Sequence, residues 1–219
     1  MNGTVHLEKG TKLILLVGQQ GAVTNLSGGG GGGSFNVFFS NSTPLSIAGG
    51  GAGASNSNDG GPGQAGEAEG LKNGNVGDGG LACVHANGNS DYPSEFGGPG
   101  GGFWSDGKCC QNVGCNGMEG KSFAFRGTGG RSPNDSAYYG GFGGGGSAGH
   151  SVGGGGGGYS GGSITGDTSD GAHTGGGGSL VPSNRGNEWS SATGACDKGD
   201  GFVRFRFVGG KVPDRKSVV

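Results

Sequence analysis

Five cysteines are the residues of this chain whose chemistry depends most on spacing: Cys83, Cys109, Cys110, Cys115 and Cys196. The C-C-x4-C arrangement of the middle three is not the spacing of a structural zinc site. His85 lies two residues after Cys83, where a surface histidine is a better interpretation than a metal ligand. We therefore expect disulfide bonds made in an oxidising compartment. The odd count leaves one thiol free, one partner on another chain, or one partner in a missing segment.

Asparagine sequons offer a second kind of modification site. Asn25, Asn41 and Asn134 each begin an N-x-S/T triplet, as does Asn2, and such triplets accept N-linked glycans in secreted proteins. Because the chain is rich in Asn, Ser and Thr, chance alone would produce a few of them. No secretory signal is visible, because the apolar run at Leu13–Val17 is too short for the hydrophobic region of a signal peptide and lies too far from the N-terminus. An extracellular location therefore requires this sequence to be a piece of a longer chain.

Motifs for catalysis and nucleotide binding are missing from the sequence. Many G-x-G-x-x-G matches occur, but none follows a strand and opens a helix, as phosphate binding requires. There is no P-loop lysine, no H-E-x-x-H, no protein-kinase signature and no serine on a strained strand-to-helix elbow. The sequence therefore predicts a chain that is not itself an enzyme, with no catalytic residues, cofactor or metal.

The composition is dominated by glycine. The chain has 219 residues, of which 63 are glycine and 7 proline, and no Gly-X-Y period, which excludes a collagen triple helix. The net charge of -2 and the lack of R-G-G repeats argue against a nucleic-acid binder. No apolar run approaches the length of a membrane span. Hydrophobic residues are 29% of the chain, too few for an ordinary core.

The glycines are concentrated in tracts, of which the stretch Gly140–Gly162 is the longest. Six consecutive glycines lie at its centre, Gly153–Gly158, and similar runs occur at Gly28–Gly33 and Gly175–Gly178. One interpretation is flexible linkers. The other is a bundle of left-handed polyglycine helices, which have three residues per turn and must find hydrogen-bond partners on neighbouring helices. Linkers would give one or two tracts between domains, whereas these tracts alternate with aromatics and short apolar runs.

Apolar runs near the start predict the first strands. Thr11–Val17 is a continuous apolar run, and its length favours a strand buried on both faces. Ser34–Ser40 alternates, with Phe35, Val37 and Phe39 on one face, and predicts a half-buried strand.

A hairpin and a final strand complete the predicted sheet. Pro44–Ala48 returns after a turn, and Asp200–Val208 places Val203, Phe205 and Phe207 on one face and two arginines on the other. Strands at both ends of the chain with glycine tracts between them predict a β-sandwich closed by its termini, with glycine helices inserted in its loops.

The polar segment Gly49–Asn89 leaves two alternatives open, because it has neither a helical period nor a clean strand pattern. It is either further glycine-helix turns or a mobile insertion.

Aromatics such as Phe103 and Trp104 follow glycine runs. We expect them to cover the outer faces of the glycine layer, where no other side chain buries area, in preference to forming residual core.

The order of these motifs resembles the glycine-rich extracellular region of the anaplastic lymphoma kinase and leukocyte tyrosine kinase receptors. The V-G-Q-Q-G segment and the G-K-S, G-T-G-G, G-G-F-G-G-G-G succession are the most specific parts. The matching pieces are Leu16–Gly21, Ser34–Phe39, Pro44–Gly51, Gly120–Phe123, Gly127–Gly130, Gly140–Gly146 and Gly153–Gly162. They cover most of the chain, from Lys12 to Gly178.

The resemblance implies an all-β domain at 1–208, followed by a linker or tail at 209–219. Its fold would be a sandwich resembling tumour necrosis factor with an inserted bundle of polyglycine-II helices and little or no α-helix. It implies an extracellular receptor region that binds a small cytokine-like polypeptide and couples it, through dimerisation, to a tyrosine kinase outside this sequence. The alternative is a secreted structural or adhesive protein on the same scaffold.

Two departures separate this chain from those receptors. Ser132–Pro133 and Ser147–Ala148 stand where the family commonly has cysteines, which is consistent with loss of a whole bridge. The approach to the last strand, Asn184–Cys196, is more similar to glycine-rich domains of invertebrate proteins. Membership of the broad glycine-rich family is therefore the safer expectation, and no ligand-contacting residue is carried over.

Overall fold

A computed structural model describes the fold of residues 1–68, 75–82, 97–109, 118–132, 138–165, 172–181, 189–194 and 199–206. Within these ranges the backbone forms strands, turns and extended coil, and helical residues occur only in short 3₁₀ turns such as η2, Phe123–Phe125. The expectation of an all-β chain with little or no α-helix is thus confirmed. The predicted tail 209–219 lies outside the described residues.

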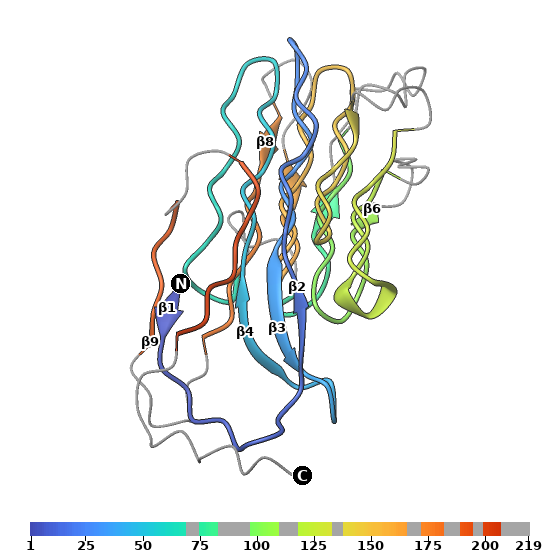
Figure 1. The fold of residues 1–219 in the computed structure, drawn as a ribbon. Coiled ribbons are helices and arrows are strands. Elements are labelled where there is room, and N and C mark those ends of the chain that lie inside the picture. Colours follow the sequence, from blue (N-terminus) through green and yellow to red (C-terminus); the bar gives the residue numbers. More distant parts are fainter. Residues whose placement is uncertain are drawn as a thin grey trace, which may run out of the picture.

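Three sheets are present in the described part of the chain. Two strands form the first (β1-β9), three the second (β2-β3-β4) and four the third (β6-β5-β7-β8). Their strands are β1 (Asn2–Gly3), β2 (Leu13–Leu16), β3 (Ser34–Phe38), β4 (Pro44–Ala48), β5 (Leu81–Ala82), β6 (Lys108–Cys109), β7 (Ile164–Thr165), β8 (His173–Thr174) and β9 (Trp189–Ser190). Figure 1 shows the second sheet at the lower end of a set of long segments that run beside one another.

The second sheet is an antiparallel meander made of the predicted early strands. Leu16 of β2 lies opposite Phe35 of β3, which lies opposite Ile47 of β4. The register shifts between Asn36 and Val37, because β4 has one extra residue, Leu45, between the partners Ser46 and Pro44. The predictions of strands within Thr11–Val17, Ser34–Ser40 and Pro44–Ala48 are therefore confirmed.

One face of this sheet carries the larger hydrophobic core. Its buried members are Leu16, Phe35, Val37, Ile47 and Phe103, with Ile14, Phe123, Tyr159 and Leu180 packed against them. The ring centroids of Phe103 and Phe123 are 5.2 Å apart, within stacking distance. The predicted buried face of β3 is correct for Phe35 and Val37 but wrong for Phe39, which follows the strand and is exposed.

The prediction that β2 is buried on both faces is wrong. Leu15 is 46% exposed, while Leu16 beside it is buried. Alternate side chains of a strand point to opposite faces, and only the face shared with Phe35 is packed against the core. The unbroken apolar run at Thr11–Val17 therefore forms an edge strand with one buried face and one exposed face.

The predicted final strand is also wrong over its described part, residues 200–206, which form no strand. Phe202 is 71% and Phe205 56% exposed. The segment bonds to the sheet only at its start, where the Gly201 N–H donates to the Gly18 carbonyl over 2.8 Å. Alternating side chains favour a strand, but a strand also needs a continuous ladder with a neighbour. Phe207 and Val208 lie outside the described residues.

The central glycine tract, Gly153–Gly158, is packed on all sides by other backbone. Its N–H groups donate to other segments over 2.9–3.3 Å, and residues three apart donate to the same neighbour. These donations are Gly154 to Gly28, Gly157 to Gly31, Gly155 to Gly98, Gly158 to Gly101 and Gly156 to Gly175. The hydrogen-bond partners of this tract thus recur every three residues.

The carbonyls of the same tract accept hydrogen bonds from a further set of segments. The carbonyls of Gly154 and Gly157, again three apart, accept from one antiparallel neighbour, 50–53. The acceptances are Gly154 from Gly53, Gly157 from Gly50, Gly155 from Gly146 and Gly156 from Gly162. The polar segment that begins at Gly49 therefore contributes to the glycine array over its first described residues. The residues of 49–89 at 69–74 and 83–89 lie outside the described part.

The aromatics after the glycine run at 97–102 divide between two environments. Phe103 is buried in the core, so the expected covering role is wrong for it. Trp104 is exposed and lies over Gly77, where an added Cβ would be 2.7 Å from the indole Cδ1. Phe103 packs against the sheet because β3 and η2 supply aromatic partners, Phe35 and Phe123, on that side.

We expect Gly155→Ala combined with Gly156→Ala to destabilise the fold strongly. A Cβ at these positions would stand within 3.0 Å of the carbonyl oxygens of Gly162 and Gly50, closer than real Cβ atoms approach. Backbone groups forced apart would each lose about 1–3 kcal/mol. The control is Gly66→Ala, where nothing lies within 4 Å of the new Cβ. Thermal unfolding should show a large fall for the double variant only; an unchanged melting temperature would refute the close packing.

A second prediction concerns buried serine hydroxyls. Ser147 is fully buried and its Oγ has no hydrogen-bond partner among the described residues, whereas the Ser27 Oγ donates to the Gly149 carbonyl over 2.6 Å. Removing an unpaired buried hydroxyl relieves a desolvation cost, and removing a paired one creates an orphan acceptor. We expect Ser147→Ala to raise the free energy of unfolding by about 1 kcal/mol and Ser27→Ala to lower it by about 1 kcal/mol. Urea unfolding measures both, and equal signs would contradict the assignment.

Candidate functional site

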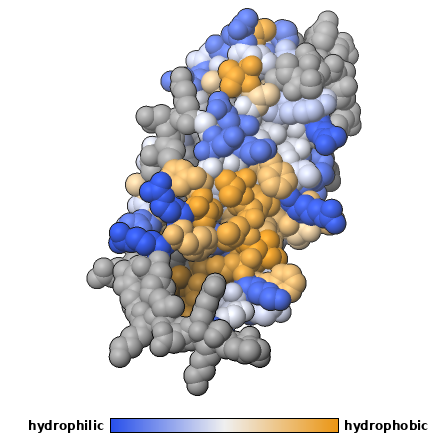
Figure 2. Space-filling view, in the orientation of Figure 1, coloured by the Kyte–Doolittle hydropathy of each residue, from blue (hydrophilic) through white to orange (hydrophobic). Residues whose placement is uncertain are grey.

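Exposed apolar side chains gather on one face of the molecule, over the sheet β2-β3-β4 (Figure 2). Leu15 and Val17 lie on the β2 side that faces away from the core, and Phe39 follows β3. Phe202 and Phe205 belong to the segment that begins at the upper end of β2. These five side chains, each more than a third exposed, are called the apolar face below. Soluble proteins rarely expose contiguous apolar surface without a binding role.

Two hydrogen bonds hold the start of the segment 200–206 to the residues that follow β2. The Gln20 N–H donates to the Asp200 Oδ1 over 2.9 Å, and the Gly201 N–H donates to the Gly18 carbonyl. Glycine at 201 allows the close approach, because a Cβ there would lie 2.7 Å from the Ser34 Oγ and 3.1 Å from the Gly18 carbonyl oxygen. The sheet thus fixes one end of the segment, which presents Phe202 and Phe205 to solvent.

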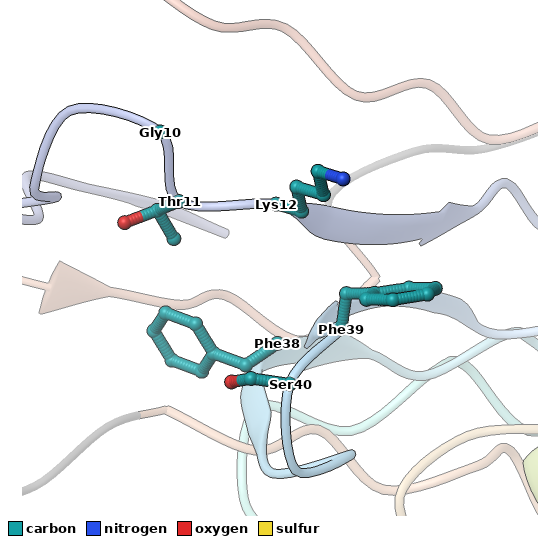
Figure 3. Close-up of a pocket in the computed structure, with 6 residues that line it drawn as sticks. All are labelled: Gly10, Thr11, Lys12, Phe38, Phe39 and Ser40. Carbon is teal, nitrogen blue, oxygen red and sulfur yellow. The ribbon is translucent and has the colours of Figure 1, made fainter.

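A shallow pocket lies at the other end of the sheet, where the chain enters β2 and leaves β3. Gly10, Thr11 and Lys12 line one side, and Phe38, Phe39 and Ser40 line the other (Figure 3). The Thr11 hydroxyl donates to the Glu8 carbonyl over 2.8 Å, which orders the approach to the strand. Aromatic rings next to an ammonium and a hydroxyl suit an aromatic or acidic side chain of a polypeptide.

Cations accompany the apolar face. Lys12 is exposed at the pocket, and Arg204 and Arg206 are exposed beside Phe205. Asp200 is the acidic group of the same segment, and its carboxylate already accepts the Gln20 N–H. An apolar surface with a basic rim favours a partner that is apolar at the contact and acidic around it.

A second cluster of charges ties the backbone together at a distance in sequence. The Lys121 Nζ lies 2.8 Å from the Glu119 Oε1 and 3.1 Å from the Asp106 Oδ2. The Asp106 Oδ1 also accepts the Ser122 N–H over 2.8 Å. The hydrogen bond to Glu119, more than any other contact, raises the pKa of Lys121, while partial burial opposes it. All three side chains are partly exposed, and the lysine forms ion pairs with both carboxylates. We therefore assign this cluster a structural role.

The structure places two of the predicted glycosylation residues at the surface. Asn25 and Asn41 are exposed, and the Asn41 Oδ1 accepts the Thr43 N–H over 3.1 Å in the β3–β4 turn. Asn134 lies outside the described residues. Neither exposed asparagine belongs to the apolar face.

Of the predicted disulfide residues, only Cys109 is described, and it is disulfide-bonded. It ends β6 and packs beside the smaller core of Ala82, Met118, Val152, Ile164 and Ala172. Cys83, Cys110, Cys115 and Cys196 lie outside the described residues. The described side chains include no group of three or more His, Cys, Asp or Glu that could hold a metal ion. Among the described residues, no helix is long and apolar enough to cross a membrane.

No model of a known protein family matches this chain, and no curated protein matches it significantly. The resemblance to glycine-rich receptor regions therefore stays a prediction. The apolar face itself was missed from the sequence, because Leu15 and Phe205 were assigned to buried faces. A signal that could have revealed the apolar face is the lack of another long apolar run that could cover the outer faces of Thr11–Val17 and Asp200–Val208.

We predict that Asp200→Ala loosens the segment 200–206 by removing the acceptor of the Gln20 N–H. Arg204 and Arg206 should then be cut faster by trypsin, because proteolysis tracks local opening. The rise should be a few-fold, in line with one exposed hydrogen bond of about 1 kcal/mol. Asp59→Ala, at an exposed position, is the control. Mass spectrometry of the cut sites over time gives the rates, and equal rates in both variants would show that this contact does not hold the segment.

Proposed function

We propose that the glycine tracts are polyglycine-II helices packed as a bundle and joined to a sandwich resembling tumour necrosis factor. Support comes from the central tract, which donates and accepts hydrogen bonds with a repeat of three residues and bonds to other segments in every case. Polyglycine-II has three residues per turn and no internal hydrogen bonds. The bundle gives the sheet a stiff support without large side chains.

The function that fits this arrangement is polypeptide binding outside the cell. The chain would be the extracellular ligand-binding region of a receptor protein-tyrosine kinase-like protein, coupling a small cytokine-like ligand to dimerisation and a kinase domain outside this sequence. The observation that carries the proposal is the apolar face, whose five side chains are 37–71% exposed. Three of them, Leu15, Val17 and Phe39, lie on or directly after the hydrogen-bonded strands β2 and β3. A rigid surface loses little conformational entropy when it binds.

The basic rim supports a polypeptide ligand over a nucleic acid. Lys12, Arg204 and Arg206 are scattered among Phe39, Phe202 and Phe205, and the whole chain has a net charge of -2. Nucleic-acid binding depends on many phosphate contacts from clustered cations. A few cations around apolar side chains resemble the rim and centre of a protein–protein interface.

The test is a binding screen of small secreted polypeptides against the purified oxidised chain, followed by variants. We expect Phe202→Ser combined with Phe205→Ser to weaken the binding of a polypeptide found in this way at least tenfold, which is about 1.4 kcal/mol. The control is Val23→Ser combined with Leu26→Ser, because both side chains are exposed and belong to the loop that the N-terminal part of the chain forms at the far end of the molecule (Figure 1). Surface plasmon resonance measures the affinities.

Three outcomes would contradict the receptor proposal. One is equal loss of binding in both pairs of variants. Another is a full reading frame without a membrane span and kinase motifs. The third is a purified chain made of disulfide-linked multimers that collapse on reduction, which would favour the secreted structural or adhesive alternative.

A further inference from the structure

The outer edge of β2 carries backbone groups that point away from its sheet. The Phe39 N–H donates to the Lys12 carbonyl over 3.0 Å, so residue 12 is in a hydrogen-bonded pair with β3. In an antiparallel ladder such pairs alternate along the strand. The even residues of β2 therefore bond to β3, and the N–H and C=O of Leu13, Leu15 and Val17 face the other side.

No described residue bonds to these outward groups. The backbone hydrogen bonds of neighbouring Gln19 and Gly18 go to Phe142, Gly32 and Gly201, whereas none involves Leu13, Leu15 or Val17. The opposite edge of the sheet is closed, because Ile47 of β4 exchanges two hydrogen bonds of 2.8 and 3.0 Å with Leu180. The sheet thus has one covered edge and one uncovered edge.

The uncovered edge lacks the features by which proteins protect such strands. Charged side chains, prolines and bulges normally prevent edge strands from pairing with other chains. β2 reads Leu-Ile-Leu-Leu without any of them, and the register shift of this sheet lies between β3 and β4. Leu15 is also 46% exposed, so its side chain is available to a neighbour.

The edge is complementary to itself. When two copies are related by a two-fold axis at Leu15, that residue faces its own copy and Leu13 faces Val17. All outward groups of these residues then pair, which gives about six interchain hydrogen bonds. Lys12 faces Gly18, so no like charges are opposed. The exposed side chains of Leu15 and Val17 from both copies form one apolar stripe.

We propose that a second copy of this chain binds the outer edge of β2 by antiparallel strand pairing centred on Leu15, giving a two-fold symmetric dimer. The contact is isologous and closes on itself, as in most homodimers. It leaves Phe39, Phe202 and Phe205 for another partner. The inference goes beyond the proposed receptor role and holds whether or not a polypeptide ligand binds.

Charge variants at the two-fold axis test the proposal. Leu15→Lys or Leu15→Glu places like charges opposite each other in the dimer, and an equimolar mixture of the two places opposite charges there. Sedimentation velocity at about 10–100 µM, typical for weak homodimers, should give twice the 21.0 kDa mass for the wild type. Each variant alone should be monomeric, and the mixture should dimerise again. Val23→Lys, at an exposed position, should stay dimeric.

A cysteine variant keeps the proposal testable if the charges disturb folding. A hydrogen-bonded antiparallel pair has a Cα–Cα distance of about 5.5 Å, which a disulfide can span. Leu15→Cys should therefore form a covalent dimer on mild oxidation, above the level of the wild type and of Val23→Cys on a non-reducing gel. A monomeric wild type, or equal crosslinking of Leu15→Cys and Val23→Cys, would overturn the proposal. Neither result depends on the binding screen, so the two proposals can fail separately.

Discussion

The fold depends on direct backbone hydrogen bonding between glycine tracts. In the central tract Gly153–Gly158, N–H and C=O groups pair with several surrounding segments, and a Cβ would collide with their carbonyls. Side chains normally keep backbone segments about 10 Å apart across a packed interior. Without side chains, the backbone itself becomes the packing surface, and hydrogen bonds take the place of much hydrophobic burial.

This constraint explains why so small a hydrophobic core is sufficient. Two separate clusters of buried apolar residues are present in the described part of the chain, one beside Phe35 and one beside Ile164. Buried polar groups are costly unless they are paired, and in the glycine array pairing is the general rule. Buried apolar residues therefore gather where the glycine array meets a sheet, and other apolar residues lie exposed at the surface.

The apolar run at Thr11–Val17, the alternation at Phe35 and Val37 and the hairpin return at Pro44–Ala48 were sufficient to predict β2, β3 and β4. Burial at Leu15 and a strand at 200–206 were predicted wrongly, because neither an apolar run nor alternation shows whether a neighbouring strand or layer is present. The candidate surface was missed for the same reason. The alternation of many glycine tracts with aromatics and short apolar runs favoured packing of the tracts over flexible linkers. Which tract contacts which, such as Gly154 with Gly28 and Gly53, depends on the whole topology.

The glycine array also restricts how this protein can evolve. Every other amino acid has at least one more carbon, so a tract position such as Gly155 has no conservative replacement. Nearly every missense change there acts through the same collision, whatever the chemistry of the new side chain. Sequence drift is therefore confined to loops and outer faces. In a hydrophobic core, a change in the volume of one side chain can be offset by a change in its neighbour, but neighbouring glycine tracts have no side chains that could do this. Diversification of such a protein would occur through its loops and its exposed sheet, while the array stays constant.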